Sequence, residues 1–197
     1  MLSQEILVLL PGVLFLTALN IMLFSDWRLL ILFLMLQYGG VTVLIAQSWP
    51  LSISLVKLIA GVMGSSMLGL SFRSGQLSDS PGPAEAPPAR VFRGFTAVLV
   101  GVSVVSFLGE AQEWFLGASR EQITGGLLLI GLGLIHAALS EQPFRIIIGL
   151  LTLVSGFEIL YATVEGSILM TAFLGALNLG IAFVGSYLLS LEGEESR

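Results

Sequence analysis

Two ionisable residues, Lys57 and Glu158, stand inside long apolar stretches of this 197-residue chain. A charge in the core of a bilayer costs roughly 3 kcal/mol or more, so such residues normally face protein, a partner charge or water. Each is therefore a candidate for moving ions. A structural explanation is open for both: Lys57 lies near the start of its stretch and could extend its ammonium to the membrane surface, and Glu158 could serve packing alone.

Asn178 is a third polar residue at depth in an apolar stretch. Asparagine in such a helix commonly just hydrogen-bonds a neighbouring helix, and that is the simpler interpretation here. We nevertheless take Glu158, Lys57 and Asn178 together as the candidate ion-path residues. Helix-to-helix hydrogen bonding is also the simpler interpretation of four further polar residues: Gln37, Thr42, Thr152 and Ser155.

Nothing in the sequence predicts a catalytic residue. His136 could titrate near neutral pH, but it lies near the end of its apolar stretch, where a hydrogen bond at the membrane surface explains it. Glu110 and Glu113 precede Trp114 and could bind a cation or act as acid and base, but a solvated edge is the simplest interpretation. No set of nucleophile, base and acid is recognisable.

The composition restricts the function classes further. The chain is 55% hydrophobic and only 11% charged, against about a quarter charged in soluble domains. The absence of cysteine excludes disulfides, iron–sulfur clusters and thiolate zinc sites. One histidine cannot form a histidine-based metal site, and a net charge of −5 argues against nucleic acid. We expect no cofactor and no metal, with the lipid bilayer as surroundings.

Seven apolar stretches predict an all-α bundle of about seven transmembrane helices, since about 20 apolar residues cross a bilayer. The N-terminus has no basic region before its first apolar stretch, so we expect that stretch to be a retained helix and not a cleaved signal. Trp27 and Trp49 suit the membrane interface. The expected helices cover residues 6–24, 29–46, 51–70, 91–108, 123–139, 144–164 and 168–189.

The stretch 71–90 contains four of the seven prolines and is too polar to cross lipid. Proline breaks helix interiors, so this stretch is expected to be a cytoplasmic loop. It separates a three-helix part, 1–70, from a four-helix part, 91–191, and a charged tail, 192–197, follows. The polar segment 109–122 could form a short interfacial helix.

Small residues four apart favour close approach of neighbouring helices. The third expected helix has Gly61, Ser65 and Gly69 in such a row, and the seventh has Ala176 and Gly180. We expect both rows to contact other helices.

The basic residues predict the orientation of the bundle. Six arginines fall in the first, third and fifth loops and the tail, whereas only Arg120 lies on the other side. Because basic residues favour the cytoplasmic side, the N-terminus is expected outside and the C-terminus in the cytoplasm. The six are Arg28, Arg73, Arg90, Arg93, Arg145 and Arg197.

Lys57 and Glu158 are expected at similar depth in this orientation. At 1.5 Å per residue, both lie roughly 10 Å from the outer ends of their helices. We predict that both face the protein interior, linked directly, through water, or through a charged residue of a partner subunit. The sequence leaves these three arrangements open.

The segment FRIIIGLLTLVSGFEILYATVEGSILMTAFLGALNLGIAFVGSYLL, residues 144–189, resembles the K-type membrane subunit of respiratory complex I and the C subunit of Mrp-type sodium/proton antiporters. Gly149, Gly156 and Glu158 match a glycine-rich second helix that carries a buried glutamate in that family. The family topology, three helices that begin outside and end inside, agrees with the orientation above. Many members carry a second glutamate in the third helix, where this chain has Asn178, so a two-glutamate path is in doubt.

The whole chain is most similar to the E subunit of group 4 membrane hydrogenases of the formate hydrogenlyase type. SISLVKLIAGVMGSSM, residues 52–67, looks like the lysine-bearing third helix of that family and is likewise followed by a proline-containing loop. Lys57 is then the matched lysine. The resemblance covers most of the chain by topology but only these two stretches by residues.

The resemblance implies a non-enzymatic membrane subunit of a complex I-like, hydrogenase-like or Mrp-like assembly that moves protons or sodium. Large antiporter-like membrane subunits would be its partners, in the plasma membrane of a prokaryotic cell. Two alternatives remain: a self-contained small transporter or channel, and a membrane scaffold in which Lys57 and Glu158 form a packing pair. A membrane-embedded enzyme ranks last because no catalytic set is present.

Overall fold

The computed structural model describes residues 4–75 and 87–195, and within them every regular element is an α-helix. The seven described helices are long and apolar enough to cross a membrane, which confirms the predicted all-α class and the expected number of helices. Their bounds are α1 (Gln4–Leu23), α2 (Trp27–Ile45), α3 (Leu51–Gly75), α4 (Pro87–Trp114), α5 (Arg120–Ala138), α6 (Pro143–Val164) and α7 (Ile168–Glu195).

Both flanks of the predicted 71–90 loop are helical. Helix α3 continues to Gly75 and α4 begins at Pro87, while residues 76–86 lie outside the described part of the chain. The predicted loop was therefore too long at both ends. Prolines do not prevent this, because the first N–H groups of a helix have no helical acceptor and a proline there loses no hydrogen bond.

Two of the predicted helices end later than expected. Helix α4 continues through Glu110 and Glu113 to Trp114, so these residues do not begin a separate interfacial helix. Helix α7 continues to Glu195, so the predicted tail is helical over 192–195, and residues 196–197 lie outside the described residues. Hydropathy indicates where a chain becomes polar, whereas backbone hydrogen bonds carry a helix beyond that point.

A capping box sets the start of α5 earlier than hydropathy predicts. The Gln122 backbone N–H donates to Ser119 Oγ at 3.2 Å, and the Ser119 N–H donates to Gln122 Oε1 at 3.0 Å. This reciprocal pair satisfies two N–H groups that a helix start leaves without partners. The same glutamine also donates to Leu44 O and Ser48 Oγ, which fastens α5 to the end of α2.

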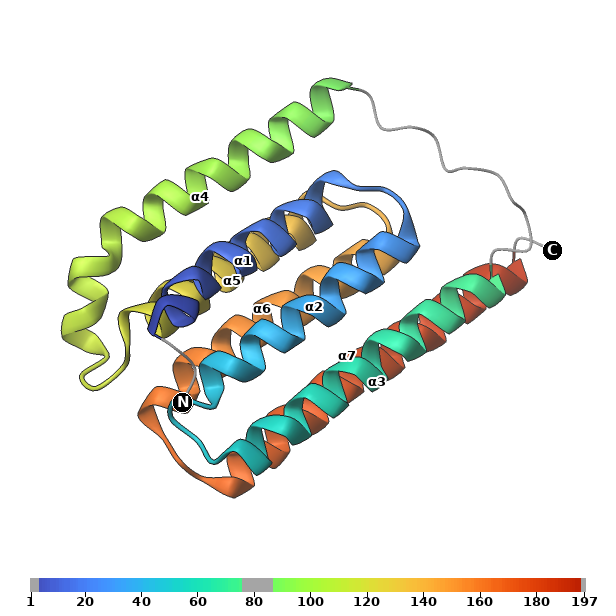
Figure 1. The fold of residues 1–197 in the computed structure, drawn as a ribbon. Coiled ribbons are helices and arrows are strands. Elements are labelled where there is room, and N and C mark those ends of the chain that lie inside the picture. Colours follow the sequence, from blue (N-terminus) through green and yellow to red (C-terminus); the bar gives the residue numbers. More distant parts are fainter. Residues whose placement is uncertain (1–3, 76–86, 196–197) are drawn as a thin grey trace.

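The helices form a central group flanked on two sides (Figure 1). Helices α1, α2, α5 and α6 lie together in the middle, and α5 and α6 share the largest contact. Helices α3 and α7 run side by side on one flank, where α3 packs on α2 and α7 on α6. Helix α4 lies on the opposite flank against α5 and α1. Helices α2, α3, α6 and α7 can therefore meet where the central group faces the α3–α7 pair.

Glycines bring α5 and α6 into backbone contact. A Cβ added at Gly133 would lie 2.7 Å from Gly149 O, and one added at Gly156 would lie 2.6 Å from Gly126 O. Each helix thus presents two glycines seven residues apart on one face, and the two pairs meet in antiparallel order. A side chain at any of these four positions would force the helices apart.

The row of small residues in α3 is a helix contact, as predicted. A Cβ at Gly61 would overlap the ring of Tyr38 in α2, and one at Gly69 would touch Ile31. The same prediction for α7 was wrong within this chain, because Ala176 and Gly180 face outward and nothing lies within 4 Å of a Cβ added at Gly180.

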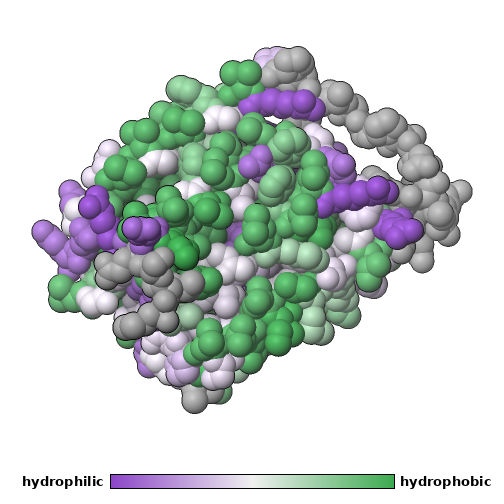
Figure 2. Space-filling model, in the orientation of Figure 1, coloured by the Kyte–Doolittle hydropathy of each residue, from purple (hydrophilic) through white to green (hydrophobic). Residues whose placement is uncertain are grey.

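The two ends of the bundle differ in charge. We call the end where α1, α3, α5 and α7 begin the N-terminal end, and the opposite end the C-terminal end. Hydrophilic residues gather at both ends and apolar residues cover the faces between them (Figure 2). Among the described arginines, only Arg120 lies at the N-terminal end. Those at the C-terminal end, by the bounds of their helices, are Arg28, Arg73, Arg90, Arg93 and Arg145.

Candidate functional site

Lys57 of α3 and Glu158 of α6 form a direct ion pair inside the bundle. The Lys57 ammonium donates to Glu158 Oε1, and the two residues are only 5% and 1% exposed. Of the three arrangements that the sequence left open, the structure has the direct link. The alternative in which Lys57 extends toward the surface is not the arrangement observed.

Asn178 of α7 joins the pair from a third helix. Its side-chain N–H donates to Glu158 Oε1 at 2.8 Å, so this oxygen accepts from lysine and asparagine together. The prediction that Asn178 hydrogen-bonds a neighbouring helix is correct, and its partner is the buried carboxylate. The structure thus brings all three candidate ion-path residues to one place.

Tyr38 of α2 is a member of the site that the sequence did not single out. Its hydroxyl donates to Asn178 Oδ1 over a long 3.4 Å, and Ser155 of α6 lies beside it. A buried tyrosine normally finds a partner for its hydroxyl, which is the signal in the sequence that could have identified it. We call Tyr38, Lys57, Glu158 and Asn178 the four-helix cluster, since each comes from a different helix.

Local packing explains why the cluster forms. Gly61 leaves space for the Tyr38 ring against α3, and Lys57 lies one turn before Gly61 on the same face. The lysine is therefore held beside the ring, on the side of α3 that faces α6. A larger residue at position 61 would displace Tyr38 from this position.

The other polar residues of the sequence analysis divide into two groups. Thr42 and Ser155 donate to Tyr38 O and Leu151 O of their own helices, at 2.8 Å each. Gln37 and Thr152 are buried, and their side-chain polar atoms have no hydrogen-bond partner among the described residues. The predicted bonds to neighbouring helices are therefore absent from the described contacts of Gln37, Thr42 and Thr152, whereas Ser155 lies within hydrogen-bonding reach of the Tyr38 hydroxyl in α2.

His136 is buried and not at the surface of the bundle. It is 3% exposed, and its Nε2 has no hydrogen-bond partner in the part of the chain that the structure describes. Arg145 and Arg93 lie close enough to act on it electrostatically. The expected interfacial hydrogen bond of the imidazole was therefore the wrong explanation for this nitrogen.

The remaining acidic candidates form no site. Glu110 and Glu113 are both exposed on α4, in agreement with a solvated edge. Across residues 4–75 and 87–195, no three His, Asp or Glu side chains lie close enough together to hold a metal ion.

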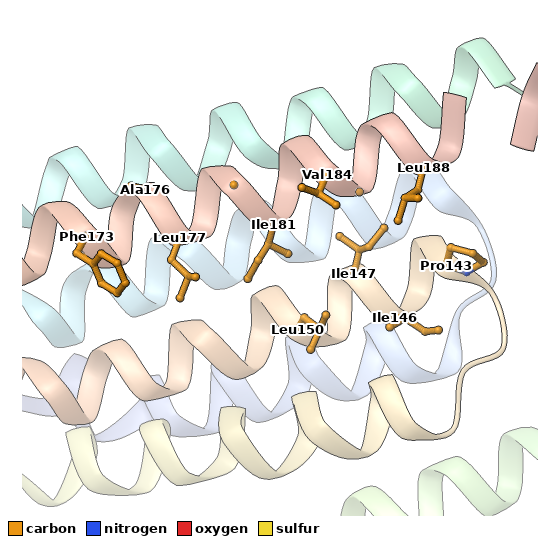
Figure 3. A pocket seen from close by; sticks show the side chains of 12 residues that line it. Pro143, Ile146, Ile147, Leu150, Phe173, Ala176, Leu177, Ile181, Val184 and Leu188 are labelled. Carbon is orange, nitrogen blue, oxygen red and sulfur yellow. The ribbon is translucent and has the colours of Figure 1, made fainter. Parts of the chain in front are cut away.

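A groove of about 700 Å³ runs along the outside of the bundle between α6 and α7 (Figure 3). Leu150 and Ile147 of α6 face Leu177 and Ile181 of α7 across it. Only apolar side chains and glycines line it, so it offers no polar group for chemistry and is separate from the four-helix cluster.

The four-helix cluster has the chemistry of a charge-holding site. A carboxylate and an ammonium in direct contact neutralise each other, and two neutral polar groups complete the shell of Glu158 Oε1. Loss of either charge would leave the other buried without compensation, which costs about 3–5 kcal/mol. A change in the charge of either side chain therefore strongly affects the other.

Comparisons with known proteins add no assignment. No protein-family model matches the chain, and neither the search of curated proteins nor that of solved structures found a match.

Proposed function

We propose that this chain is a non-catalytic membrane subunit of a complex I-like, hydrogenase-like or Mrp-like assembly that moves protons or sodium ions. The observation that carries the proposal is the ion pair of Lys57 and Glu158, buried between apolar helices and joined by Asn178 and Tyr38. The resemblance of residues 144–189 and 52–67 to subunits of such assemblies supports it.

Energetics argue against packing as the purpose of the pair. Replacing a buried ion pair by apolar residues of similar volume is often neutral or stabilising. Apolar side chains would therefore hold α3 and α6 together as well as Lys57 and Glu158 do. Ionisable residues inside membrane helices are rare and mark ion pathways, which favours a role in ion movement over a scaffold.

The distribution of arginines supports an orientation with the C-terminal end in the cytoplasm. Five described arginines lie at that end and one at the other, and basic residues favour the cytoplasmic side. Lys57 lies six residues after Leu51, and Glu158 six before Val164. In this orientation the pair lies about 9 Å from the outer end of both helices.

The outer surface supports a subunit that works beside partners. Helix α4 keeps most of its apolar side chains exposed, and the groove between α6 and α7 is apolar as well. A helix of a large membrane subunit could pack on either surface. The cluster has only three charged or amide side chains, which are too few to line a complete ion path across the membrane within this chain alone.

Extraction of the tagged protein from its own membranes in a mild detergent tests the proposed class. Mass spectrometry is expected to find large membrane subunits in fixed proportion to this chain. Inside-out vesicles carrying Glu158→Gln should still contain the assembled complex, but each complex should lose most of its ion translocation. Full translocation by this variant would overturn the proposal, and so would ion transport by the purified chain alone in liposomes.

A further inference from the structure

Three buried side chains inside the central helix group have polar atoms without hydrogen-bond partners among the described residues. They are Gln37, through both its amide nitrogen and oxygen, Thr152 through its hydroxyl, and His136 through Nε2. They are 1%, 3% and 3% exposed. An unsatisfied buried polar group costs about 1–3 kcal/mol, so three of them in one region require a physical explanation.

Gln37 and Thr152 lie on the sides of α2 and α6 that face α5. Leu44 follows Gln37 by two turns on the same face of α2, and a Cβ at Gly125 of α5 would lie 2.7 Å from the Leu44 side chain. Thr152 stands between Gly149 and Gly156, which both contact α5. Both side chains therefore belong to the junction of α2, α5 and α6.

The contacts between helices show how the polar residues are spaced along the bundle: successive members lie about one helical turn apart. Ser155 lies beside Tyr38 of the four-helix cluster, and Thr152 is one turn of α6 further toward the C-terminal end. Gly149, another turn along, meets the backbone of Ala137 in α5, the neighbour of His136. The polar residues thus descend in steps of about 5 Å from the cluster toward the C-terminal end.

We infer that Gln37 and Thr152 bind ordered water between α2, α5 and α6, and that this water connects Glu158 to His136. Buried waters typically make about three hydrogen bonds to polar groups that the protein leaves unsatisfied. The glutamine amide offers donors and an acceptor, and the threonine hydroxyl offers both. The part that this water takes in ion movement rests on the proposed function, whereas water binding itself does not.

We call Gln37, Thr152, His136 and the proposed water between them the water branch. The side chains of this branch are suited to transferring protons. A hydroxyl and an imidazole both donate and accept hydrogen bonds to water, and a histidine can also take up a proton. Hard metal cations take several oxygen ligands, and these three side chains supply only two oxygens. The branch would therefore conduct protons between the cluster and the arginines at the C-terminal end.

Two conservative variants test the branch in the assembled complex. Gln37→Met and Thr152→Val remove the polar atoms at nearly constant volume. Each variant removes hydrogen bonds to the proposed water and none to protein, so the unfolding midpoint is expected to change little, while most proton translocation is lost. Gln122→Met is the matched control: it removes the bonds to Leu44 O and Ser48 Oγ, so the midpoint should fall and translocation per complex should persist.

X-ray hydroxyl-radical footprinting, read by mass spectrometry, detects the water directly. Residues around Gln37 and Thr152 should be oxidised in the unaltered complex and protected in both variants. Protection already in the unaltered complex would overturn the water site. Unchanged translocation in both variants beside a defective Glu158→Gln would overturn the branch alone, whereas an active Glu158→Gln would reject the proposed function itself.

Discussion

Glu158 Oε1 accepts hydrogen bonds from both Lys57 and Asn178, and all three side chains are buried. A neutral residue at either end of the ion pair removes one charge and leaves the other buried. Burial favours the neutral form of a carboxyl group, and a neighbouring ammonium favours the charged form. The pair can therefore change state when a neighbour changes its charge, which is the property that an ion path needs.

Single and double substitutions of the pair should separate stability from function. Lys57→Met leaves the Glu158 carboxylate without its counter-charge and is expected to cost about 3–5 kcal/mol of unfolding free energy. The double variant Lys57→Met, Glu158→Gln removes both charges and should recover most of that loss. Denaturant or thermal unfolding of the purified complex measures the difference.

Ion translocation by the same variants distinguishes a path from a scaffold. We expect both single variants to translocate poorly, and the double variant to stay defective although its stability has returned. If the double variant regained translocation together with stability, the pair would be a packing device.

Tyr38 provides a second prediction at the scale of one atom. Tyr38→Phe removes only the hydroxyl that donates to Asn178 Oδ1, so the unfolding free energy should fall by about 0.5–1.5 kcal/mol. The hydrogen bond is long, at 3.4 Å, and the lower value is expected. Translocation should decrease while assembly persists, and Tyr187→Phe, at an exposed position of α7, is the control that should change neither.

The sequence alone identifies three members of the cluster but not the fourth. Lys57, Glu158 and Asn178 stand out because each is polar within an apolar stretch. Tyr38 does not, since most of its side chain is apolar and its part in the site depends on how α2 is rotated against α3. That rotation follows from the contact of Gly61 with the Tyr38 ring, which hydropathy does not reveal.

At the scale of whole elements, the α5–α6 contact is the tightest feature of the fold. Gly133→Ala would place a methyl group 2.7 Å from Gly149 O and even closer to the backbone of Leu153. Overpacking of this kind costs about 1–3 kcal/mol, and backbone atoms cannot move aside as a flexible side chain can. The unfolding midpoint of the purified protein is therefore expected to fall.

Gly175→Ala in α7 is the matched control for this substitution. Nothing lies within 4 Å of a Cβ at this position, and alanine is favoured over glycine in a helix by about 1 kcal/mol. Its unfolding midpoint should stay equal or rise. Equal midpoints for the two variants would show that α5 and α6 are not in close contact.

The existence and order of the helices follow from hydropathy, but their ends do not. Glu110 and Glu113 extend α4 because a helix leaving an apolar environment can continue in water. Ser119 and Gln122 start α5 early through a capping box, a local signal in the sequence that hydropathy does not detect. Which helices are neighbours could not be predicted, because the α3–α7 pair joins segments more than 100 residues apart.

At the scale of the whole molecule, the orientation in the membrane decides in which half of the bilayer the four-helix cluster lies. The chain contains no cysteine, so single introduced cysteines report one position each. Leu116 is 87% exposed in the turn between α4 and α5 at the N-terminal end. Glu141 is exposed in the turn between α5 and α6 at the C-terminal end. Neither substitution removes an arginine, so the charge bias that sets the orientation is kept.

Labelling these two cysteines with a membrane-impermeant maleimide is expected to give opposite results. Because five of the described arginines lie at the C-terminal end and basic residues favour the cytoplasmic side, Glu141→Cys should react only in inside-out vesicles. Leu116→Cys should react in intact cells. The reverse pattern would place the cluster in the cytoplasmic half of the membrane, and the water branch would then lead outward. Reaction of both cysteines from the same side would contradict the seven-span topology, because a single helix, α5, lies between the two turns and must place them on opposite sides of the membrane.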